Sequence, residues 1–180
     1  MQIFAKDFKE IFSTQLISIT GGLIAGYFLA VALDKIYLIP GFFILLPGLL
    51  DMRGNVSGSL AARLSAGLHL GVIKSRKPIN RITVENIKVA ILLTLITSLL
   101  LGSVAYLANY VFSGVDYPKI ILISIFAAVL SNIIEIPMTV FLTFWLFKRG
   151  FDPNNIMGPY VTTSGDIVTI LSLLAAVAVI

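Results

Sequence analysis

The residue best suited to chemistry in this sequence is Asp166, which lies inside the last apolar stretch, 158–180. An ionised carboxylate at the centre of a membrane helix costs about 3 kcal/mol or more, so it normally faces water, a partner group or an ion. Thr162, Thr169 and Ser172 lie at helical spacing from Asp166, so all four side chains share one helix face. This polar face is a candidate wall of a path for ions. The alternative is a structural aspartate that hydrogen-bonds to another helix or pairs with an arginine.

A second group of polar residues follows Pro47. If this stretch is helical, Asp51, Asn55 and Ser59 share one face. Proline removes a backbone donor, so the sequence predicts a kink or an unwound turn here, with carbonyl oxygens free to bind a cation. The same stretch carries a ridge of small residues that favours close backbone packing, formed by Gly54, Gly58 and Ala62.

Two more charged residues lie deep in apolar stretches. Glu135 follows Asn132 by one helical turn, about halfway along the run 119–147. It has two interpretations: a ligand used in transport, or a structural acid that is hydrogen-bonded or protonated. Arg53 lies two positions from Asp51, and pairing between them would lower the negative charge offered to an ion.

These polar groups form an all-oxygen set of possible ligands. The chain has no cysteine and a single histidine, His69, so it offers no thiolate and no imidazole cluster. Oxygen ligands suit Mg²⁺, Ca²⁺ or Mn²⁺ rather than zinc or copper. Mg²⁺ dehydrates reluctantly, so a hydroxyl-lined path with one or two carboxylates fits it well. The acids are scattered singly along the chain, and we therefore expect no catalytic cluster and no enzyme.

The composition predicts that an integral membrane protein positions these residues. Of 180 residues, 58% are hydrophobic and 12% charged, and the mean hydropathy is +1.00. Transmembrane barrel strands alternate polar and apolar residues and these runs do not, so the predicted fold is all-α. A helix needs ~20 apolar residues to cross the bilayer core. The five predicted transmembrane helices cover 14–33, 38–62, 84–112, 119–147 and 158–180.

The basic residues between these runs predict the orientation. One side carries Lys6, Lys9, Lys74, Arg76, Lys77, Arg81, Lys88, Lys148 and Arg149, and the other carries Lys35 and Lys119. We therefore expect the N-terminus inside and the C-terminus outside, in a multi-pass protein of the plasma membrane. Residues 1–13 are expected to form a short amphipathic helix at the interface or the start of the first span. Short linkers make 1–180 one domain, with membrane lipid and no nucleic acid as partner.

Two motifs give the sequence a family resemblance. The first comprises Pro47, Gly54-Asn55, Ala61-Ala62-Arg63-Leu64-Ser65 and Gly71, and the second comprises Asp152-Pro153-Asn154-Asn155, Pro159 and Gly165-Asp166-Ile167-Val168-Thr169. In type and order they resemble the second and fifth membrane helices of the MgtE family of magnesium transporters. Agreement is closer to the solute carrier branch of that family, whose members carry divalent cations.

The resemblance implies a homodimer of five-helix subunits that transports divalent cations, above all Mg²⁺. Its pore runs along the shared axis and is lined by the second and fifth helices. The two copies of Asp166 then hold a hydrated ion, and Asn55 lies beside the path. Asp51 and Arg53 stand where bacterial relatives tend to have small residues. The candidate metal ligands are Asp166, Asn55, Asp51, Glu135 and Thr162.

Other functions remain open at this point. One is an exchanger coupled to Na⁺ or H⁺, with Glu135 or Asp51 as the coupling residue. A membrane-embedded enzyme would gather its acids near one interface, which these single acids do not. A non-transporting assembly subunit would pack every polar residue named here against other helices.

Overall fold

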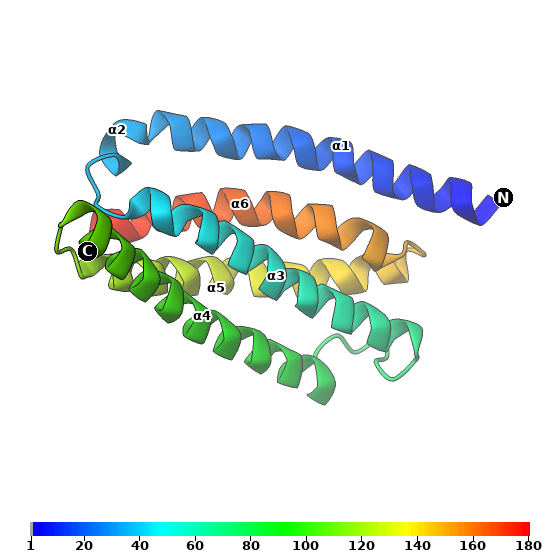
Figure 1. Ribbon diagram of the computed structural model, residues 1–180. Coiled ribbons are helices and arrows are strands. Elements are labelled where there is room, and N and C mark those ends of the chain that lie inside the picture. The colour runs from blue at the N-terminus through cyan, green and yellow to red at the C-terminus, as the bar shows by residue number, and fades with distance from the viewer. Residues whose placement is uncertain (1) are drawn as a thin grey trace.

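The protein is a bundle of helices in the computed structural model, which describes residues 2–180 (Figure 1). The all-α fold with five long helices is confirmed. The elements are α1 (Gln2–Val31), the short α2 (Leu33–Ile36), α3 (Phe42–His69), α4 (Arg81–Ser113), α5 (Lys119–Lys148) and α6 (Pro153–Val179). The two termini lie at opposite ends of the bundle, as an odd number of long helices requires (Figure 1).

Four of the helices within the described residues are long and apolar enough to cross a membrane. They are α1 from Lys6, α4, α5 and α6. The fifth long helix, α3, has 28 residues and carries Asp51 and Arg53, which lower its hydropathy. It contacts α4, α5 and α6, which bury Arg53, whereas Asp51 remains exposed on the outer face of α3.

The core lies between α3, α5 and α6, and two further contacts complete the bundle. Its centre includes Leu49, Leu60, Leu64, Ile123, Ala127 and Leu173, all buried.

Helix α1 packs along α6, where the hydroxyl of Thr163 donates to Oγ of Ser18 at 2.5 Å. Helix α4 packs against α3 and α5, and Asn132 Nδ2 donates to Oγ1 of Thr94 at 2.6 Å. Hydroxyl and amide side chains thus hold these helices together in a bilayer, where lipid provides no hydrophobic driving force for helix association.

The observed helix ends differ from the predicted ones where caps act. α6 begins at Pro153, five residues before the predicted start at 158, because the side chain of Asp152 accepts from the Asn154 amide at 2.9 Å. α1 is one continuous helix that includes residues 2–13 as well as the predicted first span. α3 continues past the predicted end at 62 to His69, since Leu64 and Leu68 still pack in the core.

The unwound turn predicted at Pro47 is absent from the described backbone. α3 is helical throughout, with Pro47 in its second turn. Proline there removes one backbone hydrogen bond, and the next residue, Gly48, lies close to α4: a Cβ added to it would lie 2.7 Å from Leu101. The carbonyl oxygens of this turn therefore belong to a continuous helix and are no ready set of cation ligands.

The contact between α4 and α5 depends on Gly102. A Cβ added there would lie 2.8 Å from Cα of Ile121 and 2.9 Å from Cβ of Ser124, and both of these atoms are held by the α5 backbone. The close approach lets the Ser124 hydroxyl donate to the carbonyl of Ser98 at 2.7 Å. A small residue at this position is thus required for the helices to meet.

We expect Gly102→Ala to destabilise the protein by about 1–3 kcal/mol, because the added methyl forces α4 away from α5. The midpoint of thermal unfolding in detergent, followed by circular dichroism, measures the change. The matched control is Gly26→Ala in α1, where no atom lies within 4 Å of an added Cβ. Equal midpoints for the two variants would contradict this account of the α4–α5 contact.

Candidate cation site

Asp166 lies at the middle of α6 and is partly exposed. It is the central residue of the 27 in α6, and its side chain is half-buried. No hydrogen bond or salt bridge joins its carboxylate to another side chain that the structure describes, although Arg53 and Glu135 lie within electrostatic range. A carboxylate this deep in an apolar helix cannot extend to the bilayer surface. It is therefore free to meet water or a cation.

Arg53 forms a buried ion pair with Glu135. Nη2 of Arg53 in α3 lies 3.3 Å from Oε2 of Glu135 in α5, and the two side chains are 1% and 0% exposed. The suggested pairing of Arg53 with Asp51 is wrong. Residues two positions apart on a helix point about 200° away from each other, so Arg53 faces the core and Asp51 faces outward. Glu135 thus faces an arginine of the same chain inside the bundle.

Gly165 creates the space that Arg53 occupies against α6. A Cβ added to Gly165 would lie 2.8 Å from Nη2 and 3.6 Å from Nε of Arg53. The guanidinium therefore lies against the α6 backbone, one residue before Asp166, and meets Glu135 as well. This arrangement was not predicted from the sequence. The available signal was a glycine beside Asp166, together with Arg53 and Glu135 near the middle of their own helices.

Several polar atoms around this ion pair have no hydrogen-bond partner among the described residues. They include Nε, Nη1 and Nη2 of Arg53 and both carboxylate oxygens of Glu135. The hydroxyls of Ser57 and Thr139, each one turn further along α3 and α5, are also unpaired. Ser164, next to Gly165, donates its hydroxyl to the carbonyl of Tyr160 at 2.9 Å. The pair therefore keeps unused donors and acceptors at the junction of three helices.

Asp51 and Asn55 lie together on the outer face of α3. Nδ2 of Asn55 donates to Oδ2 of Asp51 at 3.0 Å, and both side chains are exposed. They line a groove of 460 Å³ between α3 and α4, whose other polar residues are Ser59 and Thr97. The predicted shared face of Asp51, Asn55 and Ser59 is thus present and open.

The ridge of small residues on α3 has almost no contact with the other helices that the structure describes. No described atom lies within 4 Å of a Cβ added to Gly54, and Gly58 meets only a methyl of Val161 at 4.0 Å. Ala62 is exposed. The ridge therefore forms part of an open surface between the groove and α6.

The polar stripe on α6 divides between the open surface and the core. Thr162 is exposed, and its hydroxyl donates to the carbonyl of Gly158 at 3.1 Å. Thr169 and Ser172 are buried, with 1% and 3% exposure. Asp166 lies between these two regions. Thr162 and Asp166 thus belong to the outer side of the bundle, whereas the last two residues of the stripe face its interior.

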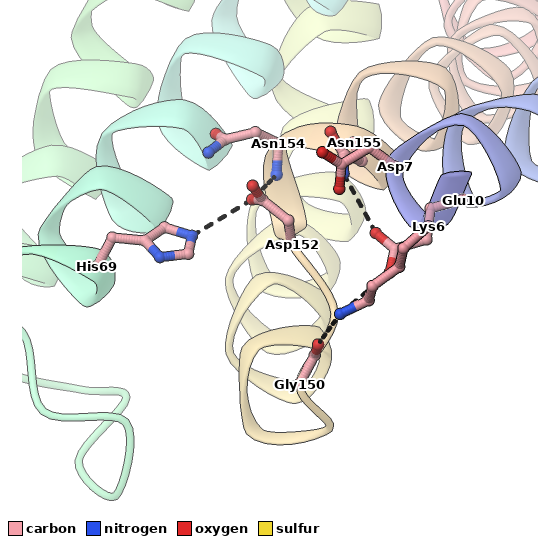
Figure 2. Close-up of polar contacts among 8 residues, drawn as sticks. All are labelled: Lys6, Asp7, Glu10, His69, Gly150, Asp152, Asn154 and Asn155. Atoms are coloured by element: carbon pink, nitrogen blue, oxygen red, sulfur yellow. Dashed lines mark hydrogen bonds and ion pairs between the residues drawn. The ribbon is translucent and has the colours of Figure 1, made fainter. Parts of the chain in front are cut away.

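The ends of α3 and α6 meet near the N-terminal segment (Figure 2). Nε2 of His69 lies 3.3 Å from Oδ1 of Asp152, the residue that caps α6. One turn into α6, Asn155 Nδ2 donates to Oδ1 of Asp7 at 3.3 Å and to Oε2 of Glu10 at 3.2 Å. These contacts join α1, α3 and α6 at this end of the bundle. His69 therefore has a structural partner far from Asp166.

No group of three or more acidic or histidine side chains within the described residues is arranged to hold a metal ion. Asp166 and Asp51 each stand as single carboxylates on the open surface, and Glu135 is committed to Arg53. A single carboxylate suits a hydrated ion better than a dehydrated one, because most of the coordination then comes from water. Among the described residues, therefore, neither of these two carboxylates belongs to a cluster that could hold a metal ion.

Comparisons with known proteins identify the family of the chain. The sequence profile of the MgtE family, described as a divalent cation transporter, matches residues 46–176. Solute carrier family 41 member 3 of Rattus norvegicus is 30% identical over 141 residues, which cover 73% of this chain and 29% of that protein. Solute carrier family 41 member 2 of Homo sapiens is 27% identical over 137 residues, which cover 73% of this chain and 24% of that protein. The chain spans less than a third of these relatives, and no solved structure matches it.

The matched region contains every charged residue described at the helix junction. It runs from the second turn of α3 to the end of α6 and includes Arg53, Glu135 and Asp166. The profile and the relatives describe transport proteins rather than enzymes, which confirms the expectation from the scattered acids. The resemblance to the solute carrier branch is confirmed as well. Because the profile covers more than half of the chain, the protein belongs to the MgtE family of divalent cation transporters.

Proposed function

We propose that the protein transports divalent cations, with Mg²⁺ as the preferred ion, across the plasma membrane. The path runs between two copies of the chain and is lined by α3 and α6. The observation that carries this proposal is Asp166, an unpaired carboxylate at the middle of a transmembrane helix on the open side of the bundle. The two Asp166 side chains of a symmetric dimer hold one hydrated ion between them.

The open surface around Asp166 supports a second copy as the partner. Gly54 and Gly58 present bare backbone with almost nothing against it, which suits close packing by another helix. Asp51, Asn55 and Thr162 are exposed on the same outer side of the α3–α6 pair, where a polar surface facing lipid is unfavourable. A second copy removes this surface from lipid and encloses a polar path.

The exposed polar residues also favour transport over a purely structural subunit. A non-transporting subunit would bury each of these groups against its own helices, whereas Asp51, Asn55 and Thr162 remain open. Within the path, Asn55 and Thr162 supply oxygens to the water around the ion, and Asp166 supplies charge. We place the N-terminus inside and the C-terminus outside, following the basic residues.

We expect Asp166→Asn to reduce Mg²⁺ flux to the level of protein-free liposomes, because the amide removes the negative charge and keeps the shape. A Mg²⁺-sensitive dye inside reconstituted liposomes measures the flux. Asp34→Asn, a change at an exposed aspartate outside the long helices, is the matched control and keeps wild-type flux. Wild-type flux from Asp166→Asn would refute the proposed role of this carboxylate.

We expect Gly54→Leu to abolish both the dimer and the flux, since a leucine side chain on the bare ridge separates the two copies. Mass photometry in detergent reports the oligomeric state. Gly22→Leu in α1 is the matched control, because it adds the same side chain at a glycine that likewise has no atom within 4 Å of an added Cβ. A dimer of unchanged stability in Gly54→Leu would exclude this ridge from the interface.

For a coupled exchanger, Asp51 is the better candidate for the coupling residue than Glu135. Glu135 is buried against Arg53, whereas Asp51 is exposed beside Asn55. Coupling through Asp51 predicts that an opposing Na⁺ or H⁺ gradient accelerates Mg²⁺ flux and that Asp51→Asn removes this acceleration. We expect instead that flux in liposomes depends on the Mg²⁺ gradient alone, with equal rates when the Na⁺ or H⁺ gradient is reversed.

A further inference from the structure

The Arg53–Glu135 pair has an unusual property for buried charges. Arginine carries five N–H donors in a rigid fork, which normally bind a carboxylate through two hydrogen bonds. Here a single Nη2–Oε2 approach of 3.3 Å joins the two groups, and all three guanidinium nitrogens lack a hydrogen-bond partner among the described residues. A buried guanidinium needs a carboxylate partner, because its desolvation is repaid only by pairing. The observed pairing is loose, so the arginine retains capacity for another acceptor.

A second carboxylate lies next to the same guanidinium. Nη2 of Arg53 approaches the backbone of Gly165, and Asp166 is the next residue along α6. Asp166 lies within electrostatic range of Arg53 and has no other charged partner of opposite sign in the described part of the chain. One buried cation therefore stands between two carboxylates, Glu135 on α5 and Asp166 on α6.

We propose that Glu135 is a positioning residue that keeps Arg53 away from Asp166. While Glu135 holds the guanidinium, the Asp166 carboxylate stays free for the transported cation. Without Glu135, Arg53 pairs with Asp166 and acts as a tethered internal cation that competes with Mg²⁺ for the same oxygens. This inference rests on the proposed function, because it assigns Asp166 to the ion.

The arrangement gives each of the four residues at the junction a distinct task. Asp166 binds the ion, Glu135 fixes the guanidinium, and Gly165 supplies the space in which the guanidinium lies. Arg53 also balances the charge of Glu135, so the junction without the ion keeps the single negative charge of Asp166. Lysine could not replace Arg53 equally, since its compact ammonium lacks the planar fork of donors that a guanidinium offers to two acceptors.

The test is a double-mutant cycle on the purified full-length protein. Isothermal titration calorimetry with MgCl₂ in detergent measures the dissociation constant for Glu135→Gln, Arg53→Met and the double variant. We expect Glu135→Gln to weaken Mg²⁺ binding by about ten-fold, a typical size for coupling between neighbouring sites. The double variant returns to within about three-fold of wild type, because the competing cation is gone. A structural role for Glu135 predicts no such rescue.

Each measured affinity either supports or overturns the positioning role of Glu135. Unchanged Mg²⁺ affinity in Glu135→Gln, or a double variant as weak as Glu135→Gln, would overturn it. If Glu135→Gln does not fold, Arg53→Met alone decides: binding at least as tight as wild type supports the inference, and weaker binding overturns it. Glu85→Gln, which breaks an exposed 2.9 Å pair with Lys88, is the matched control and leaves the affinity unchanged.

The variant Asp166→Asn separates this inference from the proposed function. If Asp166 binds the ion, Asp166→Asn loses the Mg²⁺ binding that wild type shows, and adding Glu135→Gln causes no further change. Retained binding in Asp166→Asn would refute the proposed function itself. Loss of binding in Asp166→Asn together with no effect of Glu135→Gln would refute the positioning role alone.

Discussion

The arrangement of the bundle depends on burying one ion pair, Arg53 with Glu135, far from either surface of the membrane. Two buried charges repay their desolvation only if they stay together, so α3 and α5 must present these side chains to each other. The same requirement brings α6 close, because the guanidinium lies against the bare backbone of Gly165. A polar interaction thus sets the rotation of three helices that apolar packing alone would leave less specified.

Burial of Arg53 also determines which polar side chains of α3 lie on the outer face of the bundle. Asp51 and Asn55 are each two positions from Arg53, so a helix that turns Arg53 inward turns both of them about 200° away. They are one helical turn apart from each other, and the 3.0 Å hydrogen bond between them follows from that spacing. The open polar surface and the buried ion pair are therefore two consequences of one rotation of α3.

The sequence predicted the features that the membrane imposes. Five apolar runs predicted five long helices, because a segment that crosses lipid must satisfy its own backbone hydrogen bonds. Asp166 was predicted to be functional, because an ionised group inside such a helix is energetically costly. Partners across helices were not predictable, since they depend on how each helix rotates and approaches its neighbours. From spacing alone, the nearest acid in sequence, Asp51, was a possible partner for Arg53, whereas its partner in the structure lies 82 positions away. The close approach of Gly48 to Leu101 of α4 likewise could not be predicted from spacing within α3.

A site divided between two copies follows from the cost of charge in lipid. Each chain exposes one carboxylate of the proposed site, Asp166, and keeps Glu135 neutralised by Arg53. Two unpaired Asp166 residues brought together without an ion repel each other, and a divalent cation between them cancels their charge. In the proposed dimer the ion therefore contributes to association as well as passing through, since any ligand that binds the dimer and not the monomer stabilises the dimer.

The retained water shell limits this contribution, because charges separated by water attract more weakly than charges in direct contact. Weak retention of the ion is what transport requires, since an ion that is held too tightly does not leave.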